Sequence, residues 1–150
     1  MSDKKMLIIG PRYESDIFFA LGYGFKKNNI YAIDLFSYSK LISIGDAHNL
    51  LFDSSFFDIV ILPWMIIYSD DQDTVCTESI RVLKTGGQLY IFGDHTITGQ
   101  EAGVENYNFD IKYIETLLQS RNLQPIILFS NGELGSFESG PVIYVGEKRD

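Results

Sequence analysis

The sequence predicts an α/β fold in which a mostly parallel sheet of seven strands ends in an antiparallel hairpin. Short apolar runs alternate with amphipathic segments through most of the chain, a pattern typical of parallel strands joined by helices. The last two apolar runs are joined by a loop too short for a crossover helix, so we expect them to pair antiparallel. No linker or low-complexity tract divides the chain, so we expect one domain over residues 1–150.

The first half of the chain supplies four of the expected strands and one helix. The strands are apolar runs at residues 6–9, 30–34, 41–44 and 58–62. Ile17, Leu21 and Phe25 recur at the spacing of one helix face, which predicts a helix over 14–25. Only residues 36–40 separate the second and third strands, too few for a crossover helix. We therefore expect a reduced set of helices and thin cover over the sheet near these strands.

The second half continues the alternation. Ser69 and Gln72 form a Ser-x-x-Gln capping box, which predicts the start of a helix, and Gly86 and Gly87 are expected to end that helix. The remaining expected elements are a strand at 88–92, a helix capped by Asn108 or Asp110, and strands at 126–129 and 142–145.

The composition excludes several classes of protein. A formal net charge of −8 argues against binding to a nucleic-acid backbone, which needs clustered Lys and Arg. The single cysteine excludes an internal disulfide. No apolar run approaches the roughly 20 residues of a membrane span, and the run after Lys5 is too short for a signal peptide. We expect a cytoplasmic protein without nucleic-acid or membrane partners, and the sequence has no metal-ligand spacing.

Four stretches together carry a family resemblance. They are "YAIDLFS", "GDAHNLLFDSSFFDIVIL", "SIRVLKTGGQLYIF", and the late helix with its closing hairpin. This combination resembles the class I S-adenosylmethionine-dependent methyltransferases, especially the small type 11-like members with a Gly-Asp-x-x-x-Leu-x-Phe block and a Leu-Lys-Pro-Gly-Gly turn. The resemblance implies a Rossmann-like methyltransferase fold and S-adenosylmethionine as cofactor.

The resemblance also implies a set of cofactor-binding residues. Gly10 matches the first glycine of the turn after strand one, which approaches the methionine part of the cofactor. Asp34 matches the acid that accepts hydrogen bonds from the ribose, and Asp46 the acid that contacts the adenine amino group, with Ala47 near the ring. Pro63 falls where the family lines the cofactor and acceptor. All follow the ends of predicted strands, where ligands bind in open α/β sheets. The alternative for each acid is a turn or cap.

The glycine-rich turn departs from the family pattern. Arg12 and Glu14 stand where the family has its second and third glycines. We expect Arg12 to face the cleft and contact an anionic group, such as the carboxylate of the cofactor. Glu14 must point away, pair with Arg12, or occupy part of the pocket. His95 is the candidate base, with a plain loop histidine as the alternative, and His48 is interpreted as part of the turn after Asp46.

The leading functional hypothesis is methyl transfer from S-adenosylmethionine to a small-molecule or saccharide-like acceptor. The alternative is a catalytically inactive, methyltransferase-like binding or assembly partner, favoured by the altered turn. A nicotinamide-binding domain is a third reading, but Gly-x-Gly-x-x-Gly is absent.

A homodimer is also expected, because apolar residues crowd the short second connection. These are Leu35, Phe36, Tyr38, Leu41, Ile42 and Ile44. In the competing account, loop 47–57 folds back and covers this region within one chain.

Overall fold

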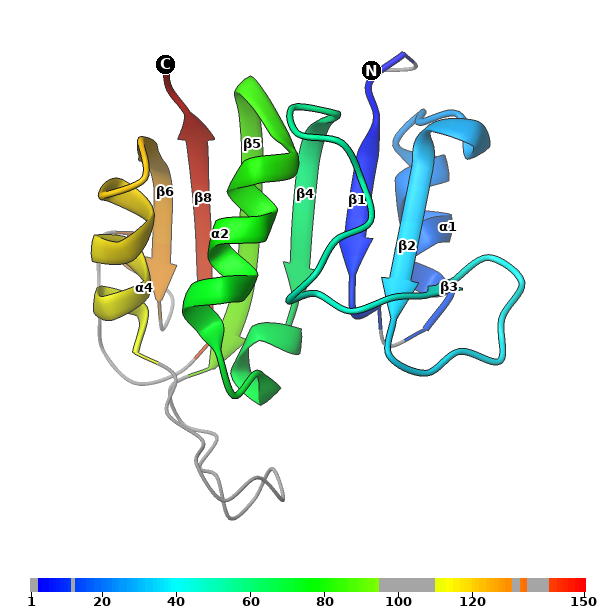
Figure 1. The fold of residues 1–150 in the computed structure, drawn as a ribbon, viewed down its shortest axis with the longest axis horizontal. Coiled ribbons are helices and arrows are strands. Elements are labelled where there is room, and N and C mark those ends of the chain that lie inside the picture. The colour runs from blue at the N-terminus through cyan, green and yellow to red at the C-terminus, as the bar shows by residue number, and fades with distance from the viewer. Residues whose placement is uncertain (1–2, 12, 95–109, 131–132, 135–140) are drawn as a thin grey trace.

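The computed structural model describes residues 3–11, 13–94, 110–130, 133–134 and 141–150. The described strands form an eight-stranded sheet with the order β3-β2-β1-β4-β5-β8-β6-β7 (Figure 1). The strands are β1 (Met6–Ile9), β2 (Ile30–Asp34), β3 (Ser43–Ile44), β4 (Phe57–Pro63), β5 (Leu83–Asp94), β6 (Leu123–Ser130), β7 (Glu133–Leu134) and β8 (Pro141–Lys148).

The pairing of the strands confirms the predicted sheet. The first five strands pair in parallel, and β8 is antiparallel to both β5 and β6. Seven of the strands correspond to the seven predicted runs. The sequence did not predict β7, a two-residue strand antiparallel to β6.

Helices cover the two faces of the sheet unequally (Figure 1). The described helices are α1 (Ser15–Gly22), α2 (Gln72–Val82) and α4 (Ile111–Gln119), with 3-10 turns η1 (Lys27–Asn29) and η2 (Met65–Tyr68). Leu7 and Ile9 of β1 join the core beneath α2 and α4, whereas Met6 and Ile8 join the core beneath α1. All four are buried, as a central parallel strand with cover on both faces requires.

Both predicted ends of the α2 helix were wrong. Asp71 is the N-cap, because its carboxylate accepts the backbone N–H of Thr74 at 3.0 Å. Ser69 lies outside the helix, and its Oγ accepts the N–H of Asp71 at 3.2 Å. The helix ends at Val82, and β5 begins at the next residue. Gly86, with φ of 73°, lies in an irregular stretch of β5 rather than in a helix cap.

The connection from β2 to β3 has no helix, as predicted, and the chain after β3 supplies the cover instead. Figure 1 shows this segment crossing in front of β1 and β2 on its way to β4. Phe52 and Phe56 pack edge-on against Tyr31 of β2, with ring centroids 5.8 and 5.7 Å away. Arg81 of α2 donates to the carbonyls of Leu50 and Phe52, both at 2.8 Å, and so ties the segment to the helix.

The cover leaves the β3 edge of the sheet exposed. Ile42 is buried and Leu41 packs against the α1 side of the core, so the prediction that they join an open patch was wrong. Four of the predicted side chains are exposed: Leu35, Phe36, Tyr38 and Ile44. We call these four the β3-edge patch. Among the described helices, none is long and apolar enough to cross a membrane.

Candidate functional site

A cleft of about 1550 Å³ opens at the carboxyl ends of the parallel strands. The residues that end or follow β1 to β5 all contribute to its wall: Gly10, Asp34, Asp46, Pro63 and Asp94. Ala47 lies there as well. The structure therefore brings five of the six predicted cofactor-binding residues into one cleft. The sixth, Arg12, and the candidate base His95 lie outside the described residues, so their placement stays a prediction.

Gly10 occupies a position that strongly disfavours any other residue. Its φ is 71°, in the left-handed region, and its N–H donates to the Ile33 carbonyl at 2.8 Å. A Cβ at Gly10 would lie 2.5 Å from Cβ of Met65, well inside contact distance. The glycine is thus explained first by the close approach of Met65, which also lines the cleft.

Glu14 points away from the cleft, one of the outcomes expected for it. It is the N-cap residue of α1 but makes no side-chain cap hydrogen bond. Its carboxylate instead accepts a hydrogen bond from the Ser39 hydroxyl in the β2–β3 connection. Glu14 therefore does not line the cleft, whereas Ser15, Asp16 and Phe19 of α1 do.

Asp34 ends β2 and is tied to its own turn. Its Oδ1 accepts the backbone N–H of Phe36 at 3.3 Å, and its carbonyl accepts the N–H of Gly45 at 3.0 Å. Asp34 therefore stabilises a turn, which was the alternative role expected for it. It uses one carboxylate oxygen and leaves acceptor capacity on the other, because an ionised carboxylate accepts at both.

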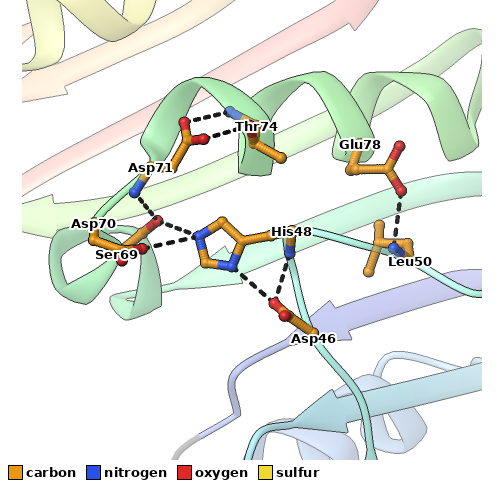
Figure 2. A network of polar contacts seen from close by, with 8 residues as sticks. All are labelled: Asp46, His48, Leu50, Ser69, Asp70, Asp71, Thr74 and Glu78. Carbon is orange, nitrogen blue, oxygen red and sulfur yellow. Dashed lines mark hydrogen bonds and ion pairs between the residues drawn. The ribbon is translucent and has the colours of Figure 1, made fainter.

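Asp46 is held by two donors from one residue. Its Oδ1 accepts both the backbone N–H of His48 and a hydrogen bond from His48 Nδ1, each at 2.8 Å (Figure 2). These bonds hold the pKa of the Asp46 carboxyl below its ordinary value. Asp46 is therefore ionised at neutral pH and acts only as an acceptor.

His48 is the functional candidate that the sequence interpretation underrated. It was assigned to the turn after Asp46, and its ring does stand there. The same ring also reaches Ser69 Oγ at 2.9 Å and Asp70 Oδ1 at 3.5 Å, on the segment after β4 (Figure 2). No sequence signal pointed to this contact, because Ser69 is 21 residues away.

The segment after β4 forms the floor of the cleft. Trp64 is left-handed, with φ of 63°, an uncommon conformation for a bulky residue, and its N–H donates to the Phe92 carbonyl at 3.1 Å. The Trp64 side chain is half-exposed and lines the cleft beside Pro63 and Met65. The end of β4 therefore lines the cleft, and its contact with a cofactor or acceptor stays a prediction.

Another part of the wall comes from α1 and from Tyr23, the residue that follows it. Asp16, Phe19 and Tyr23 line the cleft, and Phe19 and Tyr23 are largely exposed. Burial raises the pKa of the Asp16 carboxyl. Large aromatic side chains left open on a cleft wall are suited to contact a ligand.

Comparison with known proteins identifies a family over part of the chain. Residues 20–91 match the family model described as a methyltransferase domain. No curated protein sequence matches the chain.

Solved structures share the fold. A candidate sarcosine dimethylglycine methyltransferase from Galdieria sulphuraria is 13% identical with a TM-score of 0.78, over 100% of this chain and 80% of that one. A methyltransferase from Methanosarcina mazei is 15% identical with a TM-score of 0.71, over 99% and 94%. The 1,6-didemethyltoxoflavin-N1-methyltransferase of Burkholderia thailandensis, with S-adenosylhomocysteine bound, is 12% identical with a TM-score of 0.69, over 98% and 72%.

The sequence match and the shared architecture confirm the resemblance on which the sequence analysis rested. The chain has the Rossmann-like fold of the class I S-adenosylmethionine-dependent methyltransferases, and residues 20–91 match the family model of a methyltransferase domain.

Proposed function

We propose that this protein binds S-adenosylmethionine in the cleft at the carboxyl edge of its sheet and transfers the methyl group to a small-molecule acceptor. The observation that carries the proposal is the convergence of Asp34 and Asp46, from the ends of neighbouring strands, on one cleft. In this proposal, the Asp34 carboxylate accepts hydrogen bonds from the ribose hydroxyls, and the Asp46 carboxylate accepts one from the adenine amino group. Bound there, the sulfonium of the cofactor supplies an activated methyl group.

The residues present fit such a ligand at its adenosine end. Both carboxylates keep an oxygen beyond those used in their local hydrogen bonds. Ala47 and Pro63 supply apolar wall beside them, as expected around a purine ring. At the methionine end, Gly10 and the proposed Arg12 contact complete the site.

We place the acceptor against the wall formed by α1. Phe19 and Tyr23 offer aromatic faces, and Asp16 offers a partly desolvated acceptor. Aromatic faces with one carboxylate suit a small molecule that has an apolar face and hydroxyl or amino donors, which includes a saccharide-like acceptor. Positioning the acceptor against the methyl group then lowers the barrier by proximity and orientation.

A binding or assembly partner without catalysis is the second candidate. It is favoured by the altered glycine-rich turn and by Met65, whose Cβ lies only 2.5 Å from where a Cβ at Gly10 would stand. The two candidates differ in whether the cleft binds the cofactor.

Isothermal titration calorimetry of the wild-type protein with S-adenosylmethionine and S-adenosylhomocysteine separates these candidates. The enzyme proposal expects saturable binding of both ligands with one site per chain. Absence of heat with either ligand at millimolar concentration would contradict it and leave the partner proposal. Nicotinamide adenine dinucleotide is the control ligand, for which no binding is expected.

We further propose a homodimer through the β3-edge patch. The four side chains of this patch are exposed beside a strand that pairs on one side only among the described strands. A twofold contact would cover them with one self-complementary surface.

Light scattering at micromolar concentration tests the dimer. The expected mass is twice the 17.0 kDa of the chain. Phe36→Asp should return the mass to that of one chain, because it places a charge at the centre of the contact. Leu51→Asp is the matched control, since Leu51 is also exposed but lies outside the patch. A wild-type mass near 17.0 kDa would show the dimer proposal to be wrong.

A further inference from the structure

The His48 ring lies between two walls of the cleft. Nδ1 is 2.8 Å from Asp46 Oδ1 on the turn after β3, and Nε2 is 2.9 Å from Ser69 Oγ at the end of η2 (Figure 2). Asp46, His48 and Ser69 all line the cleft. One side chain thus joins the two segments that enclose this part of it.

The contacts on either side of the ring are themselves anchored. On one side, the N–H of Asn49 donates to the Asp46 carbonyl at 3.2 Å and closes the turn. On the other, Ser69 Oγ accepts the N–H of Asp71, the residue that caps α2. A chain of hydrogen bonds therefore runs from the start of α2 through Ser69 and the His48 ring to Asp46, and it holds the ring in place.

The hydrogen-bond pattern defines the role of Nδ1. Because an ionised carboxylate only accepts, Nδ1 carries a proton and donates to Asp46, while Nε2 lies 2.9 Å from Ser69 Oγ and 3.5 Å from Asp70 Oδ1. Asp46 Oδ1 then has two donors, from the ring and from the His48 backbone. Its carboxyl plane is fixed, and Oδ2 is the oxygen left for a ligand, because no described residue donates to it.

We propose that His48 is a positioning residue for nucleobase recognition: it fixes Asp46 so that Oδ2 accepts the 6-amino group of the cofactor adenine. The inference rests on the proposed function of the cleft. It adds a source of selectivity, because an adenine 6-amino group donates to a carboxylate, whereas a 6-oxo group in the same place brings two acceptors together.

The test compares two ligands that differ only at this position. Calorimetry measures the dissociation constants of S-adenosylhomocysteine and of its deaminated form, S-inosylhomocysteine. The wild-type protein should prefer the adenosyl ligand by roughly 10- to 150-fold, the range for one hydrogen bond to a charged group. The preference, rather than either affinity, is the measured quantity.

Two substitutions of His48 separate the contacts of the ring. His48→Gln places its amide near the position of Nε2, so it can keep the Ser69 contact but loses the Asp46 contact. His48→Asn places its amide near Nδ1 and does the reverse. We expect the preference to fall towards unity in His48→Gln and to be largely retained in His48→Asn.

The outcomes distinguish the inference from the proposed function. If the wild-type protein binds neither ligand, the proposed function fails. If it binds with the expected preference and His48→Gln keeps that preference, the inference is wrong, even where both affinities fall together. Should His48→Gln fail to fold, Asp46→Asn provides the second measurement. Its amide can donate to a 6-oxo group, so the preference must shrink or reverse, and an unchanged preference overturns the inference.

Discussion

Replacing Gly10 by alanine is expected to lower the free energy of unfolding by about 3 kcal/mol. A non-glycine residue at its φ of 71° costs about 1–2 kcal/mol, and a Cβ forced against Met65 adds an overpacking cost of about 1–3 kcal/mol. Met65 cannot move aside at the tip alone, because the nearest atom is its own Cβ at 2.5 Å. Chemical denaturation measures the loss.

Gly24→Ala is the matched control for this prediction. Gly24 has φ of 93°, and a Cβ there would meet nothing within 4 Å. The control therefore carries the backbone cost without the clash, and it should lose about 1–2 kcal/mol. Equal losses in the two variants would mean that Met65 does not restrict the Gly10 position.

Replacing Asp34 by alanine is expected to weaken the binding of S-adenosylhomocysteine by about 1.5–3 kcal/mol, or roughly 10- to 150-fold. The reason is the loss of a charged acceptor for two ribose hydroxyls at the end of β2 in the cleft. Asp34 also accepts the N–H of Phe36, so circular dichroism must first establish that the variant is folded. Calorimetry then gives the affinity.

Two further variants serve as comparisons for Asp34→Ala. Asp34→Asn keeps the shape and one acceptor but removes the charge, so its affinity should fall between those of wild type and alanine. Asp53→Ala removes a carboxylate from an exposed residue outside the cleft and should bind as wild type does. An unchanged affinity in Asp34→Ala would remove Asp34 from the ribose site.

The parts of the cleft predicted from sequence are those set by strand ends. Asp34 and Asp46 each follow an apolar run, and parallel strands bring their carboxyl ends to one edge, so a one-dimensional pattern was enough to group them. The same logic placed Gly10 and Pro63. No strand order was predicted, because apolar runs alone do not say which strands are neighbours.

The parts that were missed depend on contacts between distant residues. Met65 lies against Gly10, and Ser69 lies against His48, and neither pairing leaves a periodic trace in the sequence. The predicted start of α2 was wrong for a local reason. Ser69 and Asp71 are both good capping residues, and in the structure Asp71 caps the helix while Ser69 contacts His48. Tertiary contacts therefore decided between two locally acceptable caps.

The crystal structure of the complex with S-adenosylhomocysteine is the most direct test of the cofactor site. We predict that the ribose hydroxyls bind to Asp34, that the adenine amino group binds to Asp46, and that Arg12 is directed into the cleft against the carboxylate of the ligand. A ligand bound away from both carboxylates, with Arg12 directed into solvent, would contradict it.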